Sequence, residues 1–378
     1  MIPVIGYVFV MIALGRLLAE VAERMGYPGF LGEILAGILL GFVVVNPPKE
    51  ELGMLAEMGL FFLMISAGLE LTPEETRLGG RAAFPVYVVV FIIMTLLTYP
   101  ITRSIGLSNL LAGSILAVSS APIVLKLRRF FGEDFLHVAL SYAVISEVAV
   151  LALVYTFASI KSGGTDVWLK IAEQVLFIGG LFYANHVLGI EHRLWLISKL
   201  RGLKSDEAVF GMFMVVATSL GLFSEIVGMH FTVGGFLAGL FLHSDLVGTK
   251  QYKRLTTIIS GMTFGIFAPI FFVWRGINFR AGITPYVLFL FLALYGVRFI
   301  LTATLMGGED IIVSLARGAG VSSFGVLGLM VAEIGKGYGL LENGLYSLVV
   351  FSSVAGIFLS ATIGLVLLKL KKAPPELF

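Results

Sequence analysis

The sequence predicts an all-α polytopic membrane protein with about 13 transmembrane helices, built as inverted repeats with two crossed discontinuous helices. Three observations predict this class. The composition is 58% hydrophobic and 13% charged, with a mean hydropathy of +0.99, well above that of water-soluble domains of this length. A ten-residue segment recurs after an odd number of predicted helices. Polar residues also interrupt two apolar helices at corresponding positions.

Thirteen apolar segments are long enough to cross a bilayer, if interrupted helices are allowed to look short. In chain order they cover residues 2–18, 30–45, 52–69, 83–101, 110–125, 135–157, 167–188, 208–227, 231–242, 256–273, 283–306, 311–331 and 345–368. The first segment is interpreted as a membrane helix and not a signal peptide, because no small-residue cleavage pattern follows it. An odd number of helices places the termini on opposite sides of the membrane.

The basic residues predict the orientation. Of the 26 Lys and Arg residues, seventeen fall in loops that are cytoplasmic if the N-terminus lies outside, and seven fall in the outer loops. The last two, Arg298 and Arg317, lie inside predicted helices. Because basic residues accumulate in cytoplasmic loops, we expect an external N-terminus and a cytoplasmic C-terminus in the cell membrane of a prokaryote.

An internal repeat links the second and ninth segments. Residues 32–41 read GEILAGILLG and residues 234–243 read GGFLAGLFLH, with Gly, Leu, Ala, Gly and Leu at matching places. A shift of seven helices reverses the direction across the membrane, as in secondary transporters with inverted repeats. The simpler reading of the repeat is a small-residue motif for helix packing.

The fifth segment contains a helix break. Ser119, Ser120, Ala121 and Pro122 lie in the middle of an otherwise apolar helix. Proline lacks a backbone donor and clashes with the preceding turn, so the helix tends to open. Inside a bilayer such an opening is tolerated only beside protein or a water-filled cavity.

A second break is expected in the twelfth segment. A shift of 203 residues carries the first serine pair onto Ser322 and Ser323, just after the helix-weakening sequence Gly-Ala-Gly at 318–320. Two interrupted helices at corresponding positions of two repeats indicate the binding site of a secondary transporter.

The sixth segment supplies a carboxylate, because Glu147 lies beside Ser146 at its centre. A carboxylate at this depth costs roughly 3 kcal/mol or more, and such residues usually face an interior pathway. Glu147, Ser146, Ser119 and Ser120 offer the oxygen ligands that a hard cation requires, and the opened helix offers carbonyls. Burial favours a protonated carboxyl group, so a proton can compete with the cation. We therefore predict a cation and proton site, with Glu147 as the ligand of a transported monovalent cation.

Several motifs together resemble the monovalent cation:proton antiporter superfamily, closest to its bacterial and archaeal sodium/proton antiporters and its Kef-type potassium-efflux branch. They are LGRLLAEVAERMGYPGFLGEILAGILLGF at 14–42, LFFLMISAGLEL at 60–71, SSAPIVLKL at 119–127, VISEVAVLAL at 144–153, GMHFTVGGFLAGLFLH at 228–243 and FAPIFFV at 267–273. The resemblance implies a homodimer that exchanges Na⁺, or alternatively K⁺, for H⁺ by alternating access. It also implies a scaffold and dimerisation domain from residues 1–82 and 159–281, and a mobile core from residues 83–158 and 282–378.

The chain departs from the family pattern at three places. Many members have Asp-Asp or Asn-Asp where this chain has Ser146 and Glu147, and one branch has Thr-Asp-Pro at residues 120–122. Electrogenic members carry a lysine where Arg298 stands. Because serine cannot titrate and arginine stays protonated, the departures predict electroneutral exchange of one cation for one proton.

Other roles are open for the same residues. Glu147 could be a structural ion-pair partner of Arg298 or Arg317, and Glu70 is the best second carboxylate for the ion. We interpret a further set as core-stabilising or charge-compensating: Arg298, Arg317, Glu333, Ser322 and Ser323.

Other function classes fit less well. A sodium- or proton-coupled organic-anion carrier of similar architecture is the main alternative, with an arginine binding the substrate carboxylate. A channel would need a continuous polar pore. No cysteine is present, and no nucleophile and base set indicates an enzyme, a cofactor or a resident metal site. The expected partners are the two exchanged ions, the lipid bilayer and a second copy of the chain, with no nucleic acid.

Overall fold

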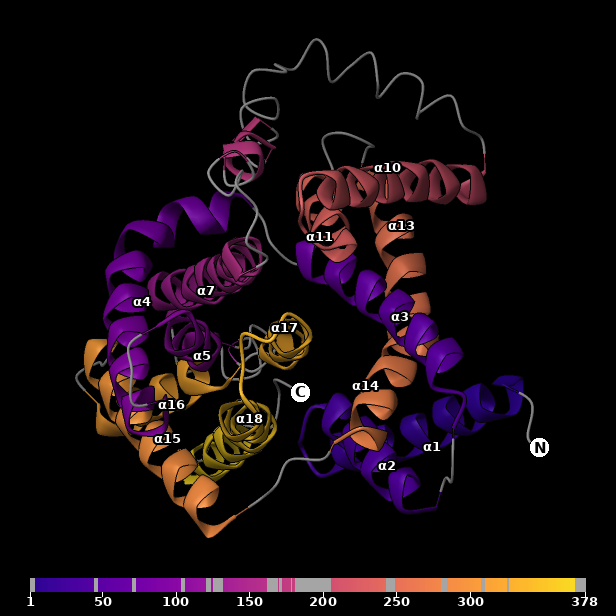
Figure 1. The fold of residues 1–378 in the computed structure, drawn as a ribbon. Coiled ribbons are helices and arrows are strands. Elements are labelled where there is room, and N and C mark those ends of the chain that lie inside the picture. Colours follow the sequence, from indigo (N-terminus) through magenta and orange to yellow (C-terminus); the bar gives the residue numbers. More distant parts are fainter. Residues whose placement is uncertain are drawn as a thin grey trace. The chain divides into compact units, whose positions relative to one another are not determined.

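The computed structural model describes residues 4–43, 47–69, 73–102, 106–119, 124, 132–161, 169, 172–177, 179–180, 205–242, 249–279, 284–306, 310–324 and 326–370. Within these residues the regular structure is helical, apart from a single antiparallel bridge between Ser119 and Phe324 (Figure 1). The all-α class expected from composition is confirmed.

The described helices follow the predicted segments. They are α1 (Val4–Arg24), α2 (Gly29–Val43), α3 (Lys49–Leu69), α4 (Pro73–Thr102), α5 (Leu107–Ala117), α7 (Gly132–Lys161), α10 (Asp206–Ile226), α11 (Phe231–Phe241), α13 (Thr249–Met262), the π-helix η2 (Thr263–Phe267), α14 (Ala268–Ile277), α15 (Pro285–Leu305), α16 (Ile311–Ser322), α17 (Val326–Gly337) and α18 (Asn343–Leu370). Seven described spans are long and apolar enough to cross a membrane. Most of the predicted seventh segment, 167–188, lies outside the described residues.

Two predicted segments end differently in the structure. The fifth stops at Ala117 and not at residue 125, and the twelfth consists of two helices, α16 and α17. Both differences follow from the predicted interruptions. The tenth segment is a continuous span of α13, η2 and α14, in which Pro269 follows the π-helical residues. Proline cannot donate to the preceding turn, which favours the local change of hydrogen-bond register.

The chain divides into two compact units. Unit 1 contains Met1–Val21, Gly32–Thr72 and Gly163–Phe279, and unit 2 contains Ala22–Leu31, Pro73–Ser162 and Arg280–Phe378. The chain passes between the units after residues 21, 31, 72, 162 and 279.

Unit 1 contains both copies of the repeated segment, in α2 and α11. A Cβ atom on Gly37 would lie 2.1 Å from the carbonyl oxygen of Val273 in α14. A Cβ atom on the corresponding Gly239 would lie 2.2 Å from the carbonyl oxygen of Ile65 in α3. Both readings of the repeat therefore hold, because equivalent glycines in the two repeats allow equivalent backbone contacts.

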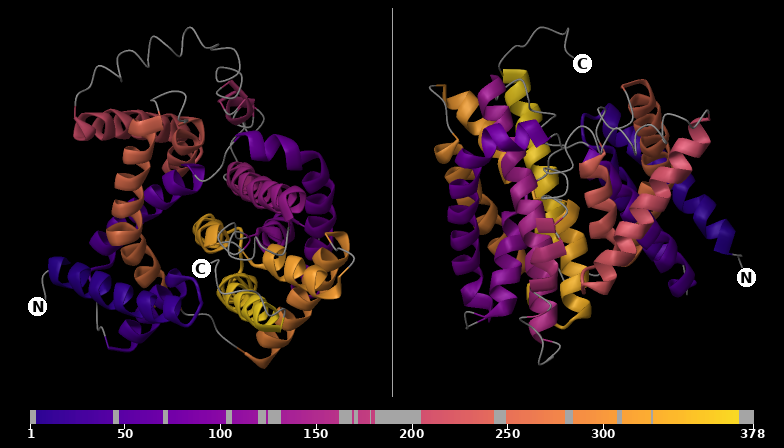
Figure 2. Two further views of the ribbon diagram at one scale, coloured as in Figure 1. Left: turned by 180° about the vertical axis from the view of Figure 1, so that it is seen from behind. Right: turned by 90° about the horizontal axis from the view of Figure 1, so that it is seen from above.

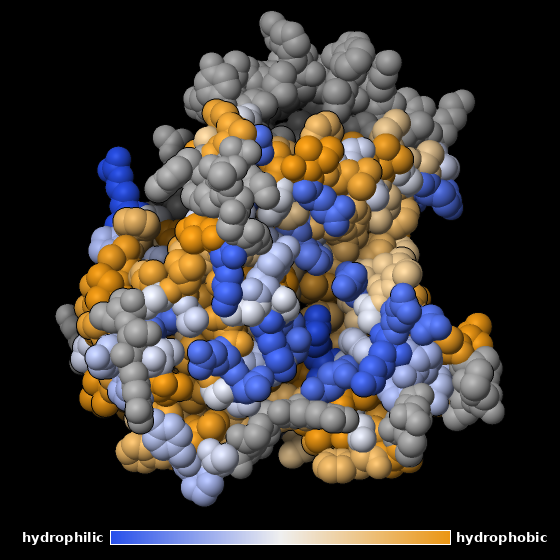
Figure 3. All heavy atoms as spheres, in the orientation of Figure 1, coloured by the Kyte–Doolittle hydropathy of each residue, from blue (hydrophilic) through white to orange (hydrophobic). Residues whose placement is uncertain are grey.

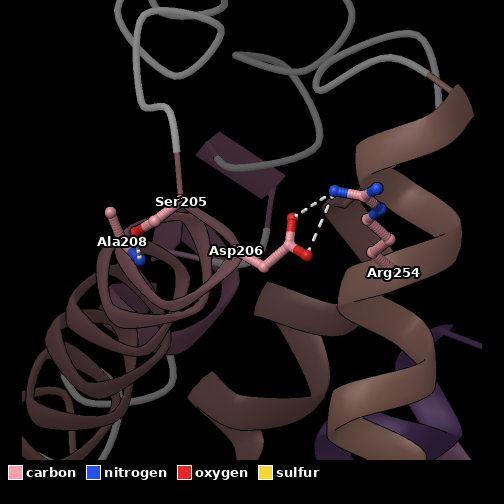
Figure 4. Close-up of polar contacts among 4 residues, drawn as sticks. All are labelled: Ser205, Asp206, Ala208 and Arg254. Atoms are coloured by element: carbon pink, nitrogen blue, oxygen red, sulfur yellow. Dashed lines mark hydrogen bonds and ion pairs between the residues drawn. The ribbon is translucent and has the colours of Figure 1, made fainter.

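The start of α10 in unit 1 is fixed by capping. Ser205 precedes the helix in an extended conformation, and its hydroxyl accepts a hydrogen bond from the Ala208 N–H at 3.2 Å (Figure 4). The next residue, Asp206, accepts two hydrogen bonds from Arg254 of α13, at 2.9 and 3.1 Å. This ion pair is exposed, so it holds the two helix ends together only weakly.

Unit 2 is built on close packing of α4 with α5 and α7, and of α15 and α17 with α18. The axes of its long helices α4, α7 and α18 lie roughly parallel to one another (Figure 2). The turn between α1 and α2 also belongs to this unit: the Tyr27 ring stacks on Phe358 at 4.9 Å, and its hydroxyl bonds to Thr362 at 3.1 Å. Both helix breaks lie in unit 2.

Large apolar side chains are exposed on both units. They include Phe9 and Leu17 of α1, Phe223 of α10, and Phe289 and Ile300 of α15. Hydrophobic residues accordingly form much of the face seen in Figure 3. An apolar surface on apolar helices of this length is what contact with lipid requires.

Candidate ion-binding site

Two helix ends meet in the middle of unit 2. Val118 follows α5 with φ −64° and ψ 134°, and Ser323 follows α16 with φ −62° and ψ 121°, so both helices change to extended backbone. The next residues, Ser119 and Phe324, pair in an antiparallel bridge. A helix that continued through Pro122 would press the proline ring against the carbonyl of Val118, which explains why α5 stops there. Each helix end leaves backbone carbonyls without intrahelical partners.

Arg298 of α15 satisfies these carbonyls. Its Nη1 donates to the carbonyl oxygen of Leu116 at 2.5 Å, and its Nη2 donates to Ala117 at 3.2 Å, Val118 at 2.8 Å and Val321 at 2.9 Å. The guanidinium therefore joins the C-terminal ends of both interrupted helices. Arg298 is completely buried, although a charged side chain is rarely so without a carboxylate partner.

The charge of Arg298 is balanced by helix ends. The C-terminus of an α-helix carries a partial charge of about −0.5, so two such ends roughly offset one guanidinium charge. The ring of Phe324 adds a cation–π contact at 4.7 Å. The four hydrogen bonds from the terminal nitrogens of Arg298 in the described part of the chain go to backbone carbonyls, and the guanidinium also interacts with the hydroxyl of Tyr142.

Helix α7 also forms hydrogen bonds with the backbone at the break. The hydroxyl of Tyr142 donates to the carbonyl oxygen of Ala117 at 2.8 Å. One turn later, the hydroxyl of Ser146 accepts from the Ser119 N–H at 3.2 Å and donates to the Ala143 carbonyl at 2.8 Å. Residues four apart share one helix face, so α7 binds the break at two points. Ser146 therefore holds the backbone of the break through a hydrogen bond.

Two oxygen-bearing residues, Ser119 at the bridge and Glu147 next to Ser146 in sequence, are candidate ligands. Glu147 follows Ser146 on α7 and is 9% exposed. The hydroxyl of Ser119 is completely buried and makes no hydrogen bond with the residues that the structure describes. A buried hydroxyl without a partner costs free energy unless something binds it. Carboxylate and hydroxyl oxygens are suitable ligands for a hard cation.

The other predicted residues are placed as follows. Ser322 and Ser323 are buried and donate to carbonyls of their own helix α16, at Gly318 and, at 2.6 Å, Gly320. Arg317 donates to the carbonyl of Met306, where α15 ends, at 3.3 Å.

Glu333 of α17 accepts a hydrogen bond from the hydroxyl of Tyr346. Ser120 and Glu70 lie outside the described residues. The crossing thus brings together Ser119, Ser146 and Arg298, with Glu147 adjoining them in sequence.

One contributor was missed by sequence reasoning. Tyr142 reads as an ordinary aromatic residue on an apolar helix. Its spacing of four residues from Ser146 was the available signal, because that spacing puts both side chains on one face.

Comparisons with known proteins identify the family. Residues 9–369 match the family described as "Sodium/hydrogen exchanger, transmembrane". The chain belongs to the sodium/hydrogen exchanger family. This exchanger is 25% identical to the probable Na⁺/H⁺ antiporter GerT of Bacillus cereus, over 87% of its own length and 89% of that protein. It is 24% identical to the Na⁺/H⁺-K⁺ antiporter GerN of the same organism, covering 89% and 88% of the two chains.

An archaeal relative and a solved structure agree with this assignment. The exchanger is 24% identical to the probable Na⁺/H⁺ antiporter 3 of Methanocaldococcus jannaschii, with 92% of each chain covered. The solved sodium proton antiporter MjNhaP1 of that organism superimposes with a TM-score of 0.71, covering 98% and 99% of the two chains at 14% identity. The antiporter fold with its inverted repeats and crossed discontinuous helices is confirmed, as is the resemblance to the monovalent cation:proton antiporters. The protein is a multi-pass membrane transporter and not an enzyme.

Proposed function

We propose that this cation/proton antiporter exchanges one Na⁺ for one H⁺ without moving net charge, by alternating access, and that Glu147 binds the two ions in turn. The observation that carries the proposal is that both terminal nitrogens of Arg298 donate to backbone carbonyls at the crossing. Arginine effectively never releases its proton, and Ser146 cannot titrate. Glu147 is then the group in this cluster that can alternate between a proton and a cation.

We further propose Ser119 as a ligand of the cation. Its buried hydroxyl has no hydrogen bond among the described residues, whereas the carbonyls of residues 116–118 are already bound by Arg298. The carbonyl oxygens of residues 116–118 are therefore not proposed as cation ligands, although the sequence led us to expect carbonyl ligands from the opened helix. Ser120 completes the proposed ligand set, and Glu70 is the carboxylate to be tested next if Glu147 is not the carrier. Sodium is favoured and potassium remains a second candidate, because one relative is named for both ions.

The proposed setting is the cell membrane of a prokaryote, with the N-terminus outside. Unit 1 would serve as the scaffold of a homodimer, and unit 2, which contains the crossing, as the mobile core. The chain has no cysteine, so single cysteines introduced at Arg128 and Lys371 report the orientation. We expect both to react with an impermeant maleimide only after the cells are opened, since the loop charges predict a cytoplasmic location. Labelling in intact cells would refute the orientation.

The stoichiometry is tested in proteoliposomes. Sodium-dependent proton movement is followed with a pH-sensitive dye while valinomycin and K⁺ gradients set the membrane potential. Each net charge moved would change the driving force by about 2.3 kcal/mol per 100 mV, so an electroneutral exchanger should give the same rate and final pH gradient at every potential. A rate or gradient that follows the voltage would contradict one-for-one exchange.

Glu147→Gln is the matched variant for the carrier. The amide keeps the shape of the side chain but cannot take up a proton and a cation in turn, so we expect a folded protein without exchange. Persistent exchange in this variant would assign the role to another carboxylate, such as Glu70 or Glu333. The organic-anion alternative gains no support, because the buried Arg298 already uses both terminal nitrogens on backbone carbonyls.

A further inference from the structure

We propose that Tyr142 is a positioning residue for transport, which fixes the end of α5 against α7 and thereby sets the place of Ser119 relative to Glu147. The inference rests on the proposed ion site. Tyr142 does not touch the ion in this account. Tyr142 lies on α7, the helix that carries Glu147, and its hydroxyl binds the backbone close to Ser119.

Two hydrogen bonds connect α7, which carries Glu147, to the backbone of residues 117–119. Ala117 is the last residue of α5, and its carbonyl accepts the Tyr142 hydroxyl at 2.8 Å. Two residues later, the Ser119 N–H donates to Ser146 at 3.2 Å. Tyr142 and Ser146 are one turn apart on α7, and Glu147 is the next residue. The segment 117–119, in which α5 changes to extended backbone, is thus held at both ends by the helix that bears the carboxylate.

Arg298 does not duplicate this contact. It reaches Ala117 at 3.2 Å, which is longer than the 2.8 Å of the Tyr142 bond, and a carbonyl oxygen can accept both. Arg298 belongs to α15 and joins α5 to α16, whereas Tyr142 joins α5 to α7. The Tyr142 hydroxyl also interacts with the Arg298 guanidinium, which places both side chains at the same helix end. Loss of the Tyr142 hydroxyl would leave the Ser146 contact as the one described hydrogen bond between α7 and the break.

The chain offers a matched control in Tyr87 of α4. The rings of Tyr87 and Tyr142 meet edge to face, with centroids 6.1 Å apart. Both side chains are buried, but the Tyr87 hydroxyl makes no hydrogen bond within the described structure. Removing either hydroxyl deletes the same atom from neighbouring rings, and only one deletion removes a contact with the break.

The test compares Tyr142→Phe and Tyr87→Phe in proteoliposomes. Loss of one buried hydrogen bond changes an equilibrium constant by about 3- to 10-fold, so Tyr142→Phe should raise the KM for Na⁺ by about this factor. Its kcat should stay within about twofold, because Glu147 still binds both ions. Tyr87→Phe should change neither quantity. As an independent readout, the Na⁺ concentration that half-maximally stabilises the detergent-solubilised protein against heat should rise by the same factor in Tyr142→Phe alone.

Three results would overturn the inference: an unchanged KM in Tyr142→Phe, equal changes in both variants, or a Tyr142→Phe protein that does not fold. The last outcome would mean that the hydroxyl is needed for the fold. Glu147→Gln, measured in parallel, separates the two proposals. If that variant is inactive while Tyr142→Phe behaves as the parent, the positioning role alone fails; if it remains active, the proposed carrier fails.

Discussion

Replacement of Arg298 by methionine gives the sharpest test of the crossing. The substitution keeps much of the side-chain length and removes every hydrogen bond to Leu116, Val118 and Val321. The Ala117 carbonyl retains its bond from Tyr142. Three buried carbonyls lose their partner at about 1–3 kcal/mol each, while removal of a buried charge recovers part of this cost. We therefore expect a net loss of about 3–5 kcal/mol.

This loss should be visible as a lower melting temperature. For a chain of 378 residues, an unfolding entropy of about 2.1 cal/mol/K per residue gives about 1.3 °C per kcal/mol, so the expected drop is about 4–6 °C. Arg298→Lys should fall between the parent and the methionine variant. It keeps a positive charge, but a compact ammonium on a flexible stem cannot hold carbonyls of two helices as a planar guanidinium does.

Arg254→Met is the control. Arg254 also forms a two-bonded contact, with Asp206, but the two side chains are 52% and 40% exposed (Figure 4). Exposed ion pairs contribute about 0–1 kcal/mol, so the melting temperature should change by about 1 °C at most. The assay is fluorescence-detected melting of the purified protein in detergent. If the Arg298→Met protein melts within about 2 °C of the parent, the carbonyls of Leu116, Val118 and Val321 do not depend on Arg298 for their stability, and this role of Arg298 is refuted.

Three further outcomes are expected. Ser119→Ala should raise the KM for Na⁺ and retain turnover, measured as above, because the carboxylate remains; loss of all exchange would contradict this. Gly239→Ala should lower the melting temperature and the yield, since its Cβ would lie 2.2 Å from a carbonyl oxygen; a parent-like protein would show that α3 and α11 can separate. Burial lowers the pKa of His230 from 6.5 although Glu57 and Glu225 oppose this, so the folded protein should lose stability as pH falls through 6.5. The His230→Asn variant keeps an acceptor that can cap α11, and its melting temperature should depend less on pH between about pH 8 and pH 5.5. The same pH dependence in parent and variant would exclude His230 as the cause.

The parts of the fold that the sequence predicted well are those with a local physical cause. Apolar segments of spanning length became helices because bilayer thickness and backbone hydrogen bonding leave few alternatives. The first break was found because Pro122 cannot continue a helix. The second follows Ser322, just after the Gly-Ala-Gly sequence at 318–320, which itself stays helical in α16. The glycines of the repeat marked close backbone contacts, since Gly37 and Gly239 leave no room for a side chain.

The contacts of the candidate site could not be predicted in the same way. Arg298 binds carbonyls 180 to 182 residues away, and nothing in its local sequence distinguishes that role from pairing with a carboxylate. The turn at Tyr27 packs on α18 and so joins unit 2, which hydropathy cannot reveal because both surfaces are apolar. Tyr142 was missed for a related reason: its function depends on where α5 ends, and that position emerges only when the helices pack.

A fixed arginine and a single variable carboxylate together explain how exchange could be coupled. Arg298 is balanced by helix ends and keeps its charge throughout, so the charge of the proposed site changes only with the occupancy of Glu147. With either a proton or a cation bound, the carboxylate is neutralised. Without an ion the carboxylate is a charge with little exposure to water, and burying a charge is unfavourable. If Glu147 is the carrier, the site without an ion is therefore the form least able to change its access from one side of the membrane to the other. This penalty would couple the transport of each Na⁺ in one direction to the return of a proton in the other.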